Sequence, residues 1–424
     1  MDRTPEQRER AIVLLVAAVQ FVNILDFVMV MPLGPDFAAA LGIPASRLGL
    51  IGGSYTAAAA FSGLAGSFFL DRFDRRPALG IAMLGLVLGT ALGSAATGLP
   101  SLMAARLLAG FFGGPATSLS FSIIADVVPP QRRGKAMGMV MGAFSIAAVL
   151  GVPAGLELAR RLGWRAPFLG VAGLGLLVAC FAVFYLPPLR GHLVARHRVP
   201  EPGGGGTVKS DVSLKHLLRQ RNVLLSWAMT FLVMSAGFIV IPNISAYVQM
   251  NLVYPRARLG LLYLYGGVVS FFSTQIAGRL VDRFGSFRVG SAGTLLLTFA
   301  IWAGFIAFPP LLPVPGIFIV FMMAMAFRNV AYNTLTTRVP SSGERARFMS
   351  IQSAVQHGAS AAGAFFSAQL LSELPNGALR GMDRVGAVSI ALTLTLPFLL
   401  FAVEGAVRRR ESLPVAQGVV PEAP

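Results

Sequence analysis

The stretch Gly278-Arg-Leu-Val-Asp282-Arg283-Phe-Gly285 repeats the pattern of an earlier one, Ser67-Phe-Phe-Leu-Asp71-Arg72-Phe-Asp74. The central aspartates of the two stretches are 211 residues apart, and Pro32 and Pro242 are 210 residues apart. Two matching features with nearly the same spacing indicate that the second half of the chain repeats the first.

Around these features the chain is strongly apolar. Apolar residues make up 55% of the 424 and charged residues 12%, against about 25% charged in soluble domains, and the mean hydropathy is +0.70. A bilayer core about 30 Å thick takes roughly 20 apolar residues per helix. The apolar runs predict twelve spans, at residues 11–31, 48–70, 78–98, 101–124, 135–159, 166–187, 222–248, 258–281, 288–308, 313–338, 346–371 and 384–406.

These spans predict an all-α integral membrane protein with twelve transmembrane helices in two six-helix bundles. Each half has an even number of spans, so both halves keep the same orientation, as in a parallel pseudo-twofold repeat about the membrane normal. We expect four parts: an N-terminal bundle at 1–187, a cytoplasmic linker with a short amphipathic helix at 188–221, a C-terminal bundle at 222–406 and a cytoplasmic tail at 407–424.

The basic residues predict the topology. With both termini on one side, the segments on that side hold 25 of the 35 Lys and Arg, and those on the other side hold 8. Basic residues gather on the cytoplasmic side of membrane proteins. We therefore expect a multi-pass protein of a bacterial inner membrane with both termini in the cytoplasm, and an N-terminal run that stays as an uncleaved first span.

Several functions are excluded by the same pattern. The net charge of +17 is explained by short loops between spans, so no nucleic acid is expected as a partner. The single cysteine, Cys180, excludes an intramolecular disulfide and a cysteine cluster for a metal. The glycine-rich run before Lys209 lacks the glycine that directly precedes the lysine of a P-loop. We expect no cofactor, no metal and no enzyme activity.

Three motifs resemble those of the major facilitator superfamily. Residues 67–76 resemble its motif G-x-x-x-D-R-x-G-R-R/K, although both glycines are replaced, and Arg106 to Gly110 match R-x-x-x-G. Gly151, Pro153 and Gly155 are similar to the Gly-Pro motif of proton-driven antiporters, with a residue between the glycine and the proline. The chain resembles most the drug:proton antiporters and the group labelled predicted arabinose efflux permeases, around residues 25–35 and 345–356.

The resemblance implies the twelve-helix fold and a gate. In related transporters the first motif latches the two halves together at the inner surface, and an acid at the end of the fourth span pairs with one of its arginines. The residues that this implies for gating are Asp71, Arg72, Arg75, Arg76 and Asp126, with Asp282 and Arg283 from the second copy.

Charged residues inside the spans are the candidates for mechanism, because a charge in hydrocarbon costs several kcal/mol. Asp26 and Arg106 each lie five residues from the same end of their spans, so both lie roughly 8 Å inside that boundary. An aspartate alternately paired with Arg106 and released could load and unload a proton. A static buried ion pair is the alternative. In the repeat register Asp26 corresponds to Gly237, so we expect the proton to be handled in the first half.

A second group of polar residues near mid-depth could bind cargo. Arg328 could bind an anionic or hydroxylated ligand, and His357 could titrate near neutral pH. Each could equally be satisfied inside the bundle, and the amides could be contacts between helices. The candidate substrate-binding residues are Asn23, Arg328, Asn329, Tyr332, Gln356 and His357.

Together these features predict a secondary transporter. We expect proton-coupled efflux of a small organic molecule by alternating access, with a drug-like molecule, a sugar or a metabolite as cargo. A facilitator or symporter that imports an anionic metabolite through Arg328 is the first alternative, and a membrane receptor or scaffold that transports nothing is the second. The expected partners are the cargo, protons and the lipid bilayer, and the protein is expected to be a monomer.

Overall fold

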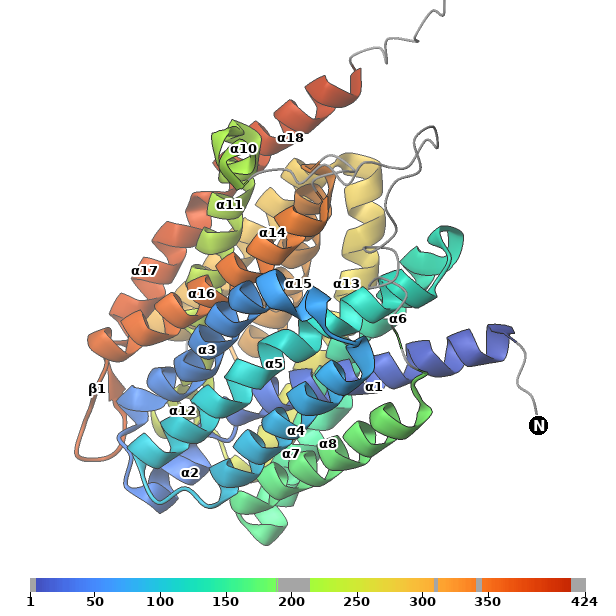
Figure 1. Cartoon of the computed structure of the whole chain (residues 1–424). Helices are drawn as coiled ribbons and strands as arrows, with labels where there is room; N and C mark the ends of the chain where they lie inside the picture. The colour runs from blue at the N-terminus through green and yellow to red at the C-terminus, as the bar shows by residue number, and fades with distance from the viewer. Residues whose placement is uncertain (1–4, 188, 190–213, 309–311, 341–344, 413–424) are drawn as a thin grey trace, which may run out of the picture.

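The computed structural model describes residues 5–187, 189, 214–308, 312–340 and 345–412 (Figure 1). Most of the expected linker and the end of the expected tail, from residue 413, lie outside the described residues. Of the linker, the described part includes one short helix, α10 (Leu214–Arg219), whose Leu217 is fully buried.

The first half of the chain forms helices joined by short turns. They are α1 (Pro5–Val30), α2 (Gly34–Leu41), the 3₁₀ turn η1 (Ala45–Arg47), α3 (Leu48–Phe69), the 3₁₀ turn η2 (Leu70–Arg72), α4 (Arg75–Ser94), α5 (Leu99–Val127), α6 (Pro130–Ile146), the π-helical turn η3 (Ala147–Gly151), α7 (Val152–Leu162) and α8 (Arg165–Tyr185).

The second half follows the same order. Its elements are α11 (Arg221–Phe238), η4 (Ile241–Asn243), α12 (Ile244–Met250), η5 (Arg256–Arg258), α13 (Leu259–Phe284), α14 (Ser286–Ile301), the π-helical turn η6 (Trp302–Ile306), α15 (Val314–Arg338), α16 (Arg345–Leu370), the hairpin strands β1 (Ser372–Glu373) and β2 (Leu379–Arg380), α17 (Met382–Leu394) and α18 (Leu396–Ser412).

A proline ends the first expected span, and another divides the seventh. The chain turns at Pro32 between α1 and α2, and at Pro242 between α11 and α12. Proline removes a helix hydrogen bond and clashes with the preceding turn, so the expected span 222–248 is two helices. The last span also has a break, at Thr395, and α18 continues six residues beyond the expected end at 406.

Eleven helical segments of the described residues are long and apolar enough to cross a membrane. The expected span at 346–371 is the exception, since α16 has 26 residues but a more polar composition. It carries Gln352, Gln356 and His357, and it packs against α3 and α11.

Large apolar side chains cover the outside of the helices. Phe61, Phe184 and Phe398 are 69%, 78% and 77% exposed. An exposed apolar surface of this extent is costly in water and favourable in hydrocarbon. The surface is therefore the one expected of a protein surrounded by lipid.

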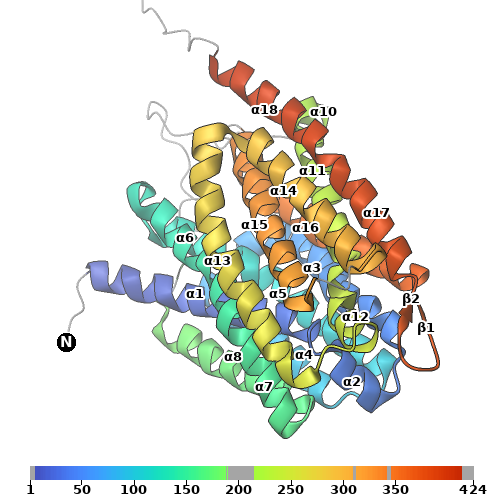
Figure 2. The same cartoon turned by 180° about the vertical axis from the view of Figure 1, so that it is seen from behind.

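The two halves meet through small residues. A Cβ atom on Gly49 of α3 would lie 2.3 Å from the carbonyl oxygen of Ala364 on α16, and one on Gly267 of α13 would lie 2.9 Å from that of Ala148 in η3. Such close backbone approach is typical of helix pairs in membranes. Figures 1 and 2 show the two sets of helices converging near α2 and α12 and spreading toward the other end.

Polar contacts join the halves at the end that carries α2 and α12. Arg256 donates from Nε and Nη2 to the two carboxylate oxygens of Asp36, at 2.7 Å each. Ser245 donates its hydroxyl to the carbonyl of Pro32 at 2.7 Å, and the carboxylate of Glu373 accepts from the backbone of Ala45. This end of the molecule, which we call the closed end, is thus held together by charge and hydrogen bonds.

Candidate functional site

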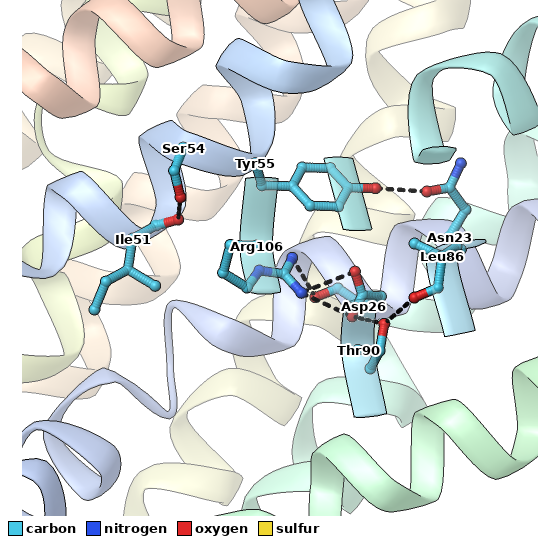
Figure 3. Close-up of polar contacts among 8 residues, drawn as sticks. All are labelled: Asn23, Asp26, Ile51, Ser54, Tyr55, Leu86, Thr90 and Arg106. Carbon is cyan, nitrogen blue, oxygen red and sulfur yellow. Dashed lines mark hydrogen bonds and ion pairs between the residues drawn. The ribbon is translucent and has the colours of Figure 1, made fainter. Parts of the chain in front are cut away.

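Asp26 and Arg106, the two charges expected at equal depth, form a buried ion pair (Figure 3). Nη1 of Arg106 donates to the carboxylate oxygens of Asp26 at 2.9 and 3.0 Å, and Nη2 donates to its backbone carbonyl at 3.2 Å. The Asp26 side chain is 0% exposed and that of Arg106 is 1% exposed. The pair joins α1 to α5 in a region shielded from solvent.

Thr90 of α4 is a third member of this site. Its Oγ1 lies 2.8 Å from Oδ1 of Asp26 and also 2.8 Å from the carbonyl oxygen of Leu86 (Figure 3). A hydroxyl has one hydrogen to donate. It can donate to a charged Asp26, or it can accept from a protonated Asp26 while donating to Leu86. Thr90 therefore has a hydrogen-bonding role in both protonation states of the carboxyl.

A polar layer borders the ion pair. Tyr55 of α3 donates its hydroxyl to Oδ1 of Asn23 at 2.6 Å, and its ring centroid lies 4.6 Å from the guanidinium carbon of Arg106. Nδ2 of Asn23 donates to the carbonyl of Gly113 and to Oγ1 of Thr117, at 2.8 Å each. The amide of Asn23, expected to bind cargo, is thus engaged with α3 and α5. Cargo would have to replace these hydrogen bonds.

Glycines on α5 make this arrangement possible. A Cβ atom on Gly110 would lie 2.1 Å from the backbone oxygen of Tyr55, and one on Gly113 would lie 2.4 Å from its hydroxyl oxygen. The R-x-x-x-G pattern thus has a physical basis, because Gly110 lets α3 approach closely enough for Tyr55 to cover Arg106.

The antiporter-type motif packs against α1 next to Asp26. Cβ atoms on Gly151 and Gly155 would lie 2.5 Å from Leu25 and 2.7 Å from Met29, so both glycines accommodate α1. Pro153 follows the π-helical turn η3, where the helix widens next to a residue that has no backbone N–H. The motif places a short irregular helix between α1 and α13 of the other half.

Arg328 is the buried cation of the second half. It is 1% exposed, and its Nη2 lies 3.1 Å from the sulfur of Met325. Its Nε and Nη1 have no hydrogen-bond partner among the described residues. Tyr332, one turn further along α15, is 1% exposed, whereas Asn329 is half-buried and its Oδ1 also lacks a partner there.

The candidates on α16 are half-buried. Gln356 and His357 are neither fully exposed nor fully enclosed, and the backbone carbonyl of Gln356 accepts from Ser360 at 2.8 Å. One turn earlier, Gln352 donates to Thr230 of α11 at 2.5 Å. The contact with Thr230 joins α16 to its own half, and no hydrogen bond among the described residues joins Gln356 or His357 to Arg328.

An aromatic stack connects the two halves near these charges. The rings of Phe27 and Tyr55 lie 5.2 Å apart, and those of Phe27 and Phe238 lie 5.8 Å apart. Phe27 follows Asp26 in the chain, and Phe238 follows Gly237. A Cβ atom on Gly237 would lie 3.4 Å from Nη2 of Arg328, so the stack runs from the ion pair of the first half to the neighbourhood of Arg328.

One of the described contacts joins two of the residues expected to form a gate. Nε of Arg75, at the start of α4, donates to Asp126, near the end of α5, at 3.4 Å, so this pair ties two helices of one half. The side chain of Asp71 lies outside the described residues. Arg72, Asp282 and Arg283 are exposed, Arg76 is half-buried, and the guanidinium carbon of Arg283 lies 5.2 Å from the ring centroid of Phe284.

The replacement of the motif's second glycine has a structural explanation. In the first copy Asp74 stands in its place and caps α4, accepting from the backbone N–H of Arg76 at 3.0 Å. In the second copy Gly285 is kept, with φ of +87°, and Glu404 of α18 accepts from the backbone N–H of Phe287 at 2.5 Å. Each helix start thus has an acid that satisfies a free N–H group. Glu404 lies inside an expected span, yet the sequence analysis did not select it.

The sequence was compared with models of known protein families. The model of the Major Facilitator Superfamily matches residues 16–364, and the chain belongs to this family. The expected family resemblance is confirmed, and the protein is a multi-pass membrane transporter rather than an enzyme.

Among its relatives are two named for resistance or efflux. A chloramphenicol resistance protein of Streptomyces lividans is 26% identical over 284 residues, which are 67% of this chain and 70% of that protein. A purine ribonucleoside efflux pump of Escherichia coli is 25% identical over 332 residues, 76% of this chain and 77% of that protein.

Solved structures share the fold. A bacterial homologue of the human lysosomal transporter Spinster, in an inward-facing and unoccupied conformation, matches with a TM-score of 0.75 at 15% identity over 96% of this chain and 99% of that one. The Escherichia coli xylose transporter, in a partially occluded inward-open conformation, matches with a TM-score of 0.67 at 19% identity over 92% and 97% of the two chains.

Proposed function

We propose that the protein exports a small organic molecule from a bacterial cell in exchange for protons, by alternating access. The observation that carries this proposal is the carboxylate of Asp26, which is 0% exposed and is held by Arg106 and Thr90 inside the helices. A carboxylate at such a depth is costly unless it has a function or a partner.

The site can support both protonation states. With Asp26 charged, Arg106 neutralises it and Thr90 donates to it. With Asp26 protonated, Thr90 accepts the new O–H, and Arg106 keeps its bond to the backbone carbonyl of Asp26. A carboxyl with acceptable partners in both states can bind and release a proton as the conformation changes its surroundings.

The relatives support export as the direction. Two of them are named for drug resistance and for efflux. The cargoes in those names differ from each other, so the cargo of this protein is proposed only as a small organic molecule.

The distribution of basic residues supports a cytoplasmic location of both termini in a bacterial inner membrane. The closed end, held by Asp36 and Arg256, then faces outward. The conformation described is accordingly inward-facing, with Asp26 enclosed. Protons would reach Asp26 after the closed end opens, and cargo would be loaded from the cytoplasm.

The test is proton movement in liposomes that contain the purified protein and a pH-sensitive dye, with lipophilic cations, sugars and organic acids as cargoes. Proton flux that depends on cargo and is lost in Asp26→Asn is the expected result. Asp383→Asn is the matched control, because Asp383 is an exposed aspartate at the start of α17. Cargo movement without proton flux, equal in all three proteins, would reject the coupling and leave a facilitator.

A further inference from the structure

Arg328 is a buried cation without a counter-charge among the described residues. The acids between residues 221 and 372 are Asp282 and Glu344. Asp282 is exposed at the far end of α13, Glu344 lies outside the described residues, and no described carboxylate forms an ion pair with Arg328. Two of its donor nitrogens have no partner in the described part of the chain. An uncompensated buried charge is strongly unfavourable, so the site is suited to an anion from outside the chain.

The internal repeat indicates where that anion would lie. Gly237 follows Asp26 by 211 residues, the spacing of the repeat. A Cβ atom on Gly237 would lie 3.4 Å from Nη2 of Arg328. The second half therefore has an arginine beside the position that holds a carboxylate in the first half, and that position has no side chain. Arg328 is not the repeat equivalent of Arg106, because the two are 222 residues apart.

We propose that Arg328 binds an anionic group of the cargo, a carboxylate or a phosphate, at its contact with Gly237. The guanidinium suits this group because its planar N–H fork matches carboxylate and phosphate oxygens. Asn329, with its Oδ1 unpaired among the described residues, lies next to Arg328 in the chain and could accept a hydrogen bond from a cargo hydroxyl or amide. This inference rests on the proposed transport function and adds the class of cargo.

The aromatic stack connects the anion site with the proton site through side-chain contacts. Phe238 adjoins Gly237 in sequence, and its ring stacks on Phe27, which adjoins Asp26. Cargo bound beside Gly237 would displace the rings of this stack. The stack includes Tyr55, whose ring lies over Arg106. Binding at one charge can thus alter the surroundings of the other without direct contact.

The first experiment needs no ligand. Gly237→Asp supplies the missing carboxylate from the chain, and Gly237→Asn supplies a neutral group of the same shape. We expect the Asp variant to have the higher Tm in detergent when Arg328 is present, and the lower Tm of the two in an Arg328→Gln background, where the carboxylate has no partner. If the Asp variant is equal to or below the Asn variant with Arg328 present, the proposed geometry is wrong.

The second experiment uses defined anions. Benzoate, hexanoate and phenyl phosphate are compared with benzamide, hexanamide and phenol as neutral analogues. At least one anion should raise the Tm of the natural protein by a few degrees. Its apparent affinity should fall about tenfold or more in Arg328→Gln and in Gly237→Asp. No anion response in the natural protein, or an equal response to the neutral analogues or in Arg328→Gln, would reject an anionic cargo.

The outcome can be separated from that of the proposed function. Anion binding that requires Arg328, without cargo-dependent proton flux in liposomes, would retain the site and reject the antiport. Proton flux driven by a neutral cargo and unchanged in Arg328→Gln would retain the antiport and reject the site.

Discussion

Phe27 and Phe238 stack across the two halves, with ring centroids 5.8 Å apart and ring planes inclined by 23°. They are 211 residues apart, so they occupy the same position in the two copies of the repeat. Equivalent residues of a twofold repeat can touch one another only close to the axis that relates the copies. The pair therefore marks the pseudo-twofold axis that relates the two halves.

Removal of one ring should impair transport more than stability. Phe238→Ala is expected to lower cargo-dependent proton flux about tenfold, because Phe27 then loses its contact with the second half. An aromatic pair is worth about 0.5–1.5 kcal/mol beyond the area it buries, so folding should persist. The measurement is flux in liposomes together with Tm in detergent.

Phe231→Ala is the matched control for this prediction. Phe231 lies two turns away on α11, is 45% exposed and forms no ring pair among the described residues. A flux in Phe238→Ala as high as in Phe231→Ala would contradict a coupling role of the stack.

Thr90 should set the pH range of transport. Thr90→Val keeps the shape but removes the hydroxyl, and a hydrogen bond to a charged group contributes about 1.5–3 kcal/mol. Because Asp26 loses a hydrogen-bond partner in both of its protonation states, the pH dependence of cargo-driven flux should change in this variant. Thr90→Ser keeps the hydroxyl and should behave as the natural protein does. An unchanged pH profile in the valine variant would show that Thr90 has only a packing role.

The close packing of α3 on α5 should be sensitive to one methyl group. Gly110→Ala would place a Cβ atom 2.1 Å from the backbone oxygen of Tyr55, so one of the helices has to shift, at a cost of about 1–3 kcal/mol. Gly138→Ala on α6 has nothing within 4 Å and is the control. Thermal unfolding in detergent should show a lower Tm for the first variant and little change for the second. Equal Tm values would contradict this packing.

The sequence predicted the transmembrane helices well because their signal is local. A run of some twenty apolar residues has few alternatives to a helix in lipid. The effect of prolines was less predictable. Pro115 lies inside the continuous helix α5, whereas Pro32 accompanies a turn. Whether a proline breaks a helix depends on neighbouring helices that satisfy the freed carbonyl groups, and this information is not local.

The same distinction applies to the site. Asp26 and Arg106 were recognisable from the sequence because charges are rare in apolar runs. Thr90 and Tyr55 were missed, since threonine and tyrosine are common in such helices. Their contact with the ion pair depends on which faces of α3 and α4 turn inward. Only the packing of these helices reveals that the carboxyl has a hydroxyl partner.

The last prediction concerns the closed end. Arg256 binds both oxygens of Asp36 and also donates to the carbonyl of Leu156 at 3.3 Å, with Asp36 and Leu156 in the first half and Arg256 in the second. The Arg256 and Asp36 side chains are 26% and 23% exposed, so the pair is only partly screened by solvent. Asp36→Asn removes the charge from this link. The population of molecules open at this end should rise roughly fivefold, which corresponds to about 1 kcal/mol.

The measurement is the distance between spin labels on cysteines introduced at Arg47 and Pro375, two exposed positions at the closed end in different halves. Cys180 is exposed and must first be replaced by serine. Asp36→Asn should add a longer distance to the distribution, and Asp383→Asn should leave it unchanged. If both variants keep the distribution of the parent, the glycine contacts such as that of Gly49 with α16 would suffice to hold this end closed, and the ion pair would have no part in gating.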